Sequence, residues 1–256
     1  MSPEKKDKRQ ERLAQVQRQQ QQQQRWIIIG MIVLGAALVV FAVVWPQLQP
    51  GGETAEVAPP VGEVSTVGPA ALPNPDGLSL GDPNATVTID VFEDFQCPAC
   101  QFFTETIETR VIEDLVAAGK ARYVFHNYPF LDGEGAGNGG ESDQAANASM
   151  CANEQGKFWE MHSTIFANWD GENQGAFSDP RLQALAESLG LDMAAFNECF
   201  TANKYEADIQ ADFDLGKQMG VSGTPTVFVN GSKAGQPGKI ATYEEIVQAV
   251  EQAIDK

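Results

Sequence analysis

The chain has 256 residues, of which 17 are basic and 35 acidic, and its formal net charge is −18. The first 25 residues hold seven basic and three acidic residues, which leaves 10 basic and 32 acidic residues and a charge of about −22 for the remainder. This surplus argues against binding of nucleic acid or anionic lipid by the part of the chain that follows the tail.

The first element in chain order is an uncharged apolar stretch, residues 26–45, with a tryptophan at each end. A helix of twenty residues, at 1.5 Å per residue, covers the roughly 30 Å hydrocarbon core of a bilayer. A cleaved signal peptide is the alternative, but it has an apolar core of about 7–15 residues and an A-x-A-like site, and the following PQLQPGG offers no such site. The stretch therefore predicts an uncleaved transmembrane helix.

The flanks of this helix predict its orientation. The tail, residues 1–25, is basic and rich in glutamine, and no Lys or Arg follows the helix until Arg110. The positive-inside rule then places the N-terminus in the cytoplasm and the rest of the chain outside, as in a single-pass protein of a bacterial cell envelope. Residues 46–76 are rich in Pro, Gly, Ala and Val and lack aromatic residues, which predicts a flexible linker.

Residues 77–256 suit one α/β domain. Strand, helix and strand patterns come first, helical periodicity then occupies about 140–219, and a strand, an edge strand and a helix with a capping box close the chain. This order predicts a thioredoxin-like fold with an inserted helical subdomain. The segments are 85–95 (strand), 99–119 (helix), 120–130 (strand), 141–219 (helices), 225–231 (strand), 232–240 (turn and edge strand) and 242–255 (helix).

Two of the four cysteines form a Cys-Pro-Ala-Cys motif at 97–100, where the first strand gives way to a helix. A thiolate at Cys97 would meet the unpaired N–H groups of the helix start, which stabilise its charge and lower its pKa. Pro98 fits the first helical turn, and Cys100 lies one turn on, within reach of Cys97. We therefore expect Cys97 to be the nucleophile and Cys100 the resolving thiol of a redox disulfide.

Zinc binding and a passive cross-link are the alternatives for this motif. A zinc site needs four ligands, and the other two cysteines are isolated, while His126 and His162 are far apart in the sequence. A cross-link over four residues restricts the unfolded chain very little and would add little stability. Redox chemistry is the stronger interpretation, and no metal is expected.

The other two cysteines, Cys151 and Cys199, lie on helical patterns inside the predicted insertion. Disulfides persist outside the cytoplasm, so a structural bridge between the two is favoured, and it would contribute about 4 kcal/mol by the chain-entropy relation. A second redox pair that relays electrons is the alternative.

Further along, Thr224-Pro225 precedes a strand, where either a cis peptide or an ordinary trans proline at an edge fits the sequence.

The stretches FQCPACQFF, CANEQGKFWEMHSTIFAN, LGLDMAAFNECF and GVSGTPTVFVNG together resemble the membrane-anchored DsbA-like thiol:disulfide oxidoreductases over roughly residues 78–254. The resemblance implies a thioredoxin fold, a cis proline at Pro225, and main-chain hydrogen bonds from Thr224 and Pro225 to an extended substrate. It also implies that exported proteins with cysteines are the substrates, that a membrane partner of the DsbB or vitamin K epoxide reductase type is the reoxidant, and that no cofactor is bound.

One position departs from the family pattern. Relatives often carry a buried acid six residues before the nucleophile, where this chain has Val91. Glu93 and Asp94 are the nearby candidates for the proton relay, whereas strand alternation turns Asp90 to the face opposite Val91.

The leading functional prediction is an enzyme that introduces disulfides into exported proteins. A reductase or isomerase using the same site is the first alternative, because redox poise decides the direction of exchange. Isomerases commonly dimerise through an added domain, and no such domain is visible here. The expected form of the protein is a monomer. A membrane-tethered binding or chaperone module without redox turnover is the second alternative.

Overall fold

The computed structural model describes residues 72–133, 137 and 139–255. The predicted cytoplasmic tail, the transmembrane helix at 26–45 and most of the linker lie outside these residues. Among the helices that are described, none is long and apolar enough to cross a bilayer.

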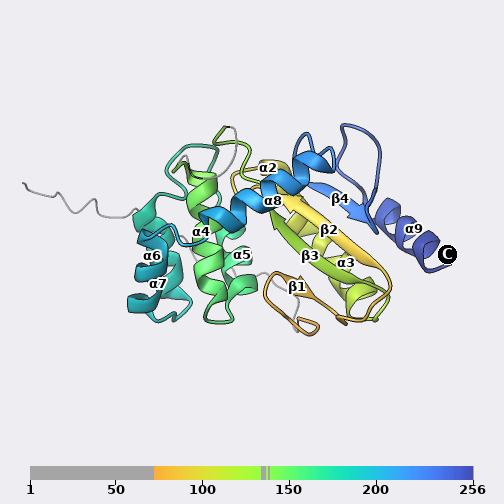
Figure 1. Ribbon diagram of the computed structural model, residues 1–256, viewed down its shortest axis with the longest axis horizontal. Helices are drawn as coiled ribbons and strands as arrows, with labels where there is room; N and C mark the ends of the chain where they lie inside the picture. Colours follow the sequence, from red (N-terminus) through yellow and green to blue (C-terminus); the bar gives the residue numbers. More distant parts are fainter. Residues whose placement is uncertain (1–71, 134–136, 138, 256) are drawn as a thin grey trace, which may run out of the picture. The chain divides into compact units, whose positions relative to one another are not determined.

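The described domain contains a five-stranded sheet with the strand order β1-β3-β2-β4-β5 (Figure 1). The central strand, β2, runs parallel to β3, and the remaining neighbours pair antiparallel. A helical crossover of 98–116 connects the parallel pair, as such strands require. The strands are β1 (Ser79–Leu80), β2 (Thr88–Glu93), β3 (Arg122–Asn127), β4 (Thr226–Val229) and β5 (Ser232–Lys233).

The helices follow the predicted order. The crossover consists of consecutive α-helical and π-helical turns, and Gly119 follows it with φ of +71°, a value that favours glycine. The helical segments are α2 (Pro98–Phe103), η1 (Thr104–Glu108), α3 (Thr109–Val111), η2 (Ile112–Val116), α4 (Glu141–Asn153), α5 (Phe158–Ala167), α6 (Asp179–Ser188), α7 (Met193–Thr201), α8 (Glu206–Gln218) and α9 (Tyr243–Ile254).

Different helices cover the two faces of the sheet. On one face, Phe213 of α8 packs with Phe92, Tyr128 and Phe228, and Figure 1 shows α8 running from the helical subdomain across the strands. On the other face, Ile89 and the other inward-facing side chains join the main core with the crossover helices and α9. Strand alternation assigns these faces, because successive side chains of β2 point in opposite directions.

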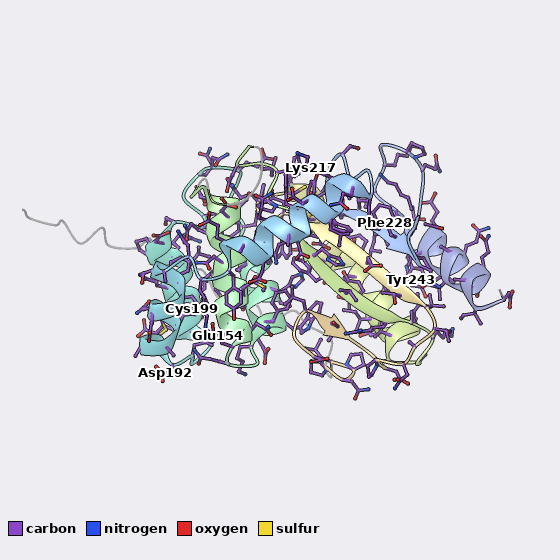
Figure 2. The ribbon with its side chains drawn as sticks, in the orientation of Figure 1. Glu154, Asp192, Cys199, Lys217, Phe228 and Tyr243 are labelled. Atoms are coloured by element: carbon purple, nitrogen blue, oxygen red, sulfur yellow. A yellow bond between two sulfur atoms is a disulfide. The ribbon has the colours of Figure 1, made fainter. Side chains whose placement is uncertain are left out.

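The helical subdomain consists of α4, α5, α6 and α7, and α8 contacts both α4 and β3. The segment 140–219, predicted as an insertion, thus includes one helix that also covers the sheet. A disulfide joins Cys151 of α4 to Cys199 of α7 across 48 positions of sequence, with 5.8 Å between the two Cα atoms. Figure 2 labels Cys199 in this subdomain, near Glu154 and Asp192.

The N-terminal border of the domain lies earlier than the sequence predicts. Leu72 packs against the core, the N–H of Gly81 donates to the carbonyl of Pro73 at 2.7 Å, and Asp76 forms a bridge with Ser79. Residues 72–76, predicted as the end of the linker, therefore belong to the fold. Composition misplaced this border because backbone hydrogen bonds and a single apolar contact fix the segment.

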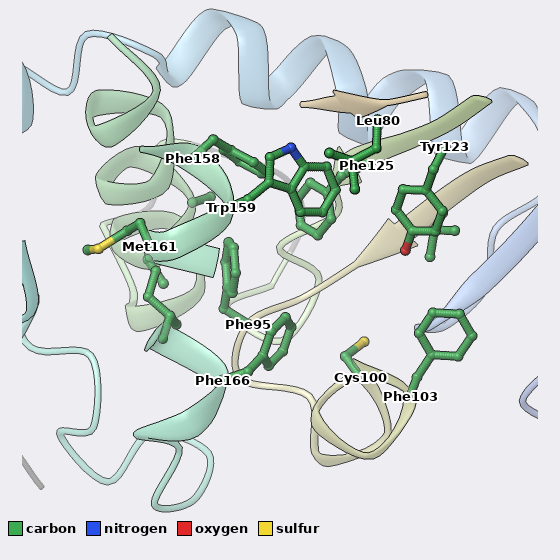
Figure 3. Close-up of a cluster of buried hydrophobic side chains, with 14 of the residues drawn as sticks. Leu80, Phe95, Cys100, Phe103, Tyr123, Phe125, Phe158, Trp159, Met161 and Phe166 are labelled. Carbon is green, nitrogen blue, oxygen red and sulfur yellow. The ribbon is translucent and has the colours of Figure 1, made fainter. Parts of the chain in front are cut away.

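Aromatic side chains fill the space between the sheet and α5 (Figure 3). His162 lies among them with 0% exposure, its ring 5.0 Å from the centroids of both Phe125 and Phe166. Burial lowers the pKa of His162 to about 3, so the imidazole is neutral at physiological pH. Its place inside the aromatic core makes His162 a packing residue of the helical subdomain.

Candidate active site

The dithiol motif begins at the point where the crossover helix starts. Strand β2 ends at Glu93, three residues turn, and Cys97 takes the N-cap position with extended backbone angles, φ −75° and ψ 119°. Its carbonyl accepts from the N–H groups of Cys100 and Gln101 at 3.0 and 3.1 Å, and Pro98 occupies the first turn. This is the position predicted from the sequence, with the thiol at the positive end of the helix.

The two thiols differ in environment. Cys97 is 6% exposed and Cys100 is 0% exposed. Hydrogen bonds lower the pKa of Cys97 from 9.0 to about 6 against the opposing effect of burial; the largest comes from the Cys100 thiol, and smaller ones come from Thr224 and from the N–H groups of Cys100 and Ala99. Burial raises the pKa of Cys100 well above its ordinary value, and the hydrogen bond to Cys97 raises it further. The pair therefore combines a charged outer sulfur with a protonated inner one.

Thr224 and Pro225 lie against the outer sulfur. The peptide bond between them is cis, and the Cys97 sulfur is 3.4 Å from the Thr224 carbonyl oxygen, to which it donates while it is protonated. The Thr224 hydroxyl is buried and makes no hydrogen bond of ordinary geometry within the described part of the chain. It is nevertheless close enough to both sulfurs to lower their pKa values.

Glu93 ends β2 on the same strand face as Val91, directed into the core below the thiols. Burial raises the pKa of Glu93 well above its usual range, and the charges of Glu108 and Cys97 raise it further. One carboxyl oxygen accepts weakly from Thr104 at 3.4 Å, and the other is buried without a partner among the described residues. A neutral carboxyl group that lies next to the dithiol and makes only one weak hydrogen bond among the described residues can donate and accept a proton.

Asp94 makes hydrogen bonds that hold the loop before the dithiol motif. Its carboxylate accepts from the Ser142 hydroxyl at 2.6 Å and from the N–H groups of Gln96 and Leu131 at 2.8 and 3.0 Å. Burial raises the pKa of Asp94 to about 7, although these three hydrogen bonds lower it. Of the two candidate relays, Glu93 has the free oxygen and the electrostatic link to the sulfurs, whereas Asp94 holds the loop in place.

A third buried acid, Glu108, is not among the residues that the sequence analysis names. It lies on the crossover, accepts from the Tyr123 hydroxyl at 2.7 Å, and is 3.9 Å from the Nε2 atom of His162. Burial raises the pKa of Glu108 to about 7, and its charge acts on Glu93. A signal was present in the sequence, because Glu108 falls three and four positions before Val111 and Ile112 on the apolar side of the helix.

His126, the other histidine, lies away from the thiols. Its two ring nitrogens are each 3.0 Å from a carboxylate oxygen, one of Asp90 and one of Asp212, on the sheet face that α8 covers. Burial alone would lower the pKa of His126, but hydrogen bonds with both aspartates and their charges raise it to about 9. The protonated His126 therefore links α8 to the sheet through its contacts with both aspartates.

The described residues contain no group of three or more side chains suited to hold a metal ion.

Comparison with known proteins gives consistent matches. A model of the thioredoxin family matches residues 73–249. A probable disulfide bond formation protein D from Bacillus anthracis is 25% identical over 180 residues, which cover 70% of this chain and 78% of that protein. The crystal structure of oxidised BdbD from Bacillus subtilis superposes with a TM-score of 0.62 at 25% identity, covering 73% of this chain and 100% of that one.

A different kind of relative shares the same region. The Na⁺/H⁺ antiporter NhaA 3 of Salinispora tropica is 34% identical over 169 residues, which cover 66% of this chain. The match spans only 24% of the antiporter's own length, about a quarter of that protein.

Proposed function

The chain belongs to the thioredoxin family and its described domain is a protein disulfide oxidoreductase, and from this we propose that it introduces disulfide bonds into exported proteins. The observation that carries the oxidising direction is the asymmetry between the two thiols, with a pKa of about 6 at Cys97 and a raised pKa at Cys100. Stabilising the thiolate stabilises the reduced form of the motif, which makes its disulfide the better oxidant. We infer no transport activity from the antiporter match.

The exchange begins with the Cys97–Cys100 disulfide and a substrate that carries two thiols. One substrate thiolate attacks the Cys97 sulfur, a mixed disulfide forms, and the Cys97–Cys100 bond breaks with its electron pair on Cys100. The second substrate thiolate then attacks the substrate sulfur of the mixed disulfide and releases Cys97 as a thiolate. Two electrons pass to the motif, one substrate proton is taken up at Cys100, and the other enters solvent.

The proton at Cys100 has to cross a buried environment, and we assign its transfer to Glu93. A thiolate at Cys100 is disfavoured by burial and by a negative charge on Glu93, so the two groups are stable only when they hold at least one proton. A protonated Glu93 can supply that proton during oxidation of substrate and take it back when the motif is reoxidised. Glu93→Gln keeps the shape and removes the transferable proton, and we expect it to slow exchange at Cys100 while the Cys97 pKa stays near its wild-type value, because the carboxyl that is replaced is neutral.

Extended substrate would lie along Thr224 and Pro225, because the Thr224 backbone is next to the attacked sulfur. The segment 26–45, outside the described residues, is proposed to anchor the protein in the cell membrane with this domain outside the cytoplasm. A membrane partner of the DsbB or vitamin K epoxide reductase type is the proposed reoxidant. The protein is proposed to act as a monomer, and the Cys151–Cys199 disulfide to serve structure and not electron relay.

The decisive experiment measures oxidation of a reduced, unfolded protein whose activity depends on its disulfides. Oxidised wild type should restore that activity, Cys97→Ser should fail completely, and Cys100→Ser should accumulate a mixed disulfide through Cys97. The equilibrium of the motif with glutathione decides the direction. A motif that stays oxidised under the same conditions in which substrate thiols are reduced would identify a reductase, and capture of substrate that survives Cys97→Ser would identify a binding module.

A further inference from the structure

A pocket of about 330 Å³ lies beside the dithiol motif. Its lining comes from Ala99 of α2, the segment 222–226, Lys233 of β5 and the loop 238–240. Ala99 is two residues beyond Cys97, and the Thr224 carbonyl in the same wall is 3.4 Å from the Cys97 sulfur. A substrate cysteine bonded to that sulfur would therefore sit at the mouth of the pocket.

The charge of the wall is opposite to that of the domain. Residues 77–256 contain 28 acidic and 10 basic residues, yet the pocket is lined by two lysines, Lys233 and Lys239, and by no carboxylate. Within the described part of the chain, neither lysine lies at ion-pairing distance from an acid. Lys239 donates to the side chain of Gln236 at 3.1 Å. The nearby Glu245 accepts from Gln236 and from the N–H of Thr242, and the charge of Lys239 is among the influences that lower its pKa, but no ion-pair contact joins the two side chains.

Protection of the sheet edge does not account for both cations. A lysine on an edge strand such as β5 opposes pairing with another chain, which would explain Lys233. Lys239 lies in the loop that follows β5, outside the sheet, so this reason does not apply to it. Phe102, which is 53% exposed, is one helical turn after Ala99 and adds an aromatic surface on the same side of α2.

We propose that this pocket is a subsite for an acidic side chain of the substrate, an Asp or Glu within two residues of the cysteine that reacts with Cys97. The proposal rests on the proposed disulfide exchange and names a substrate class for it. Residues two apart in an extended chain point to the same side about 7 Å from each other, which brings such a side chain from the mouth of the pocket to its wall. Elsewhere the acidic domain repels the same peptide, so the two lysines also favour one binding orientation.

The test uses single-turnover reactions of oxidised protein with peptides that carry two cysteines. The peptides differ only at the positions two residues before and after the first cysteine, which hold Asp, Asn or Lys. Each rate constant is divided by the rate constant of the same peptide with a neutral small-molecule disulfide, to remove differences in thiol reactivity. We expect the Asp peptide to exceed the Lys peptide by about tenfold at low salt, and the ratio to fall as salt is added.

Two matched double variants locate the effect. Lys233→Gln/Lys239→Gln should reduce the ratio of Asp-peptide to Lys-peptide rates from about tenfold to one or below, whereas Lys120→Gln/Lys204→Gln, with the same loss of net charge, should preserve it. A ratio that survives the first pair, or that both pairs lower equally, would overturn the assignment to the pocket. Equal normalised rates for all peptides would overturn the subsite and leave the enzyme function intact, whereas no reaction with any peptide would overturn the function itself.

Discussion

Replacing Cys100 by alanine or by serine tests what holds the Cys97 pKa low. The strongest lowering influence on Cys97 is the hydrogen bond from the Cys100 thiol. Alanine removes that donor, whereas serine keeps one at nearly the same place. A hydrogen bond to a charged group contributes about 1.5–3 kcal/mol, which corresponds to a change of roughly one to two in pKa. We therefore expect a Cys97 pKa of about 7 to 8 in Cys100→Ala, and a value that stays near 6 in Cys100→Ser.

The assay follows thiolate absorbance near 240 nm against pH. Each variant has Cys97 as its single free thiol, because Cys151 and Cys199 are joined in a disulfide. The Cys97→Ser variant supplies the background. If the alanine and serine variants titrate at the same pH, the Cys100 hydrogen bond is not the cause of the low pKa. If both titrate near 9, the N-terminal position in the helix also contributes nothing, and the oxidase assignment loses its physical basis.

The lowered pKa of Cys97 also affects the reduction potential of the motif. A pKa lowered from 9.0 to about 6 corresponds to about 4 kcal/mol of thiolate stabilisation. At pH 7 a thiol of pKa 9.0 would still be protonated, so the lower pKa stabilises the reduced motif by only about tenfold there. At roughly 30 mV for each tenfold change in a two-electron couple, the motif is about 30 mV more oxidising at pH 7, and about 90 mV more oxidising above pH 9, than the same pair without that stabilisation. The Thr224→Val variant lacks the hydroxyl that lowers the pKa of Cys97. When wild type and variant are each equilibrated with glutathione, the variant should therefore be the weaker oxidant.

Three further predictions concern stability. The pKa of His126 is raised to about 9, so its contribution should be complete below about pH 6.5 and lost as pH rises through 9; in oxidised protein, where Cys97 does not titrate, the difference in unfolding free energy between wild type and His126→Ala in urea should shrink by roughly 3 kcal/mol over this range. Replacing Cys151 and Cys199 with alanine should cost about 4 kcal/mol of unfolding free energy and leave substrate oxidation intact at temperatures where the variant is folded. A truncated protein that begins at Leu72 should be soluble, folded and active, whereas one that begins at Leu78 should unfold at lower temperature; equal melting temperatures would mean that residues 72–76 add no stability.

The sequence predicts the dithiol motif well because its signals are local. A β-branched run, a short turn and an amphipathic helix place Cys97 at a helix start without any knowledge of distant contacts. The same local rule of alternation puts Glu93 on the face of Val91, so the acid expected two residues earlier is replaced by one on the same side of the strand. Its role could not be separated from that of Asp94 in sequence, because Ser142 and Leu131 make the difference from distant parts of the chain.

The features that the sequence misses depend on long-range placement. Strand β1 has two residues, too few for any alternation to be recognised, and it exists because Leu78 and the strand itself pair with β3. The domain border at Leu72 also depends on a contact with distant residues, because Leu72 packs against the core although the stretch before it has the composition of a linker. Lys233 and Lys239 are six residues apart in a turn-rich segment, and only the folded loop brings them to the wall beside Cys97.

The helical insertion takes part in building the redox site, and this follows from where its polar groups bond. The indole of Trp169 donates to the Gln96 carbonyl at 2.7 Å, and the side chain of Gln101 donates to the Phe166 carbonyl at 3.3 Å. The buried Gln96 side chain donates to Ser142, at the start of α4, at 2.9 Å. Without the insertion these buried groups on both sides of the motif would lose their partners, at a cost of about 1–3 kcal/mol each. The loop that presents Cys97 would then be free to leave the conformation in which the Cys100 thiol reaches its sulfur, so the insertion and the low Cys97 pKa depend on the same contacts.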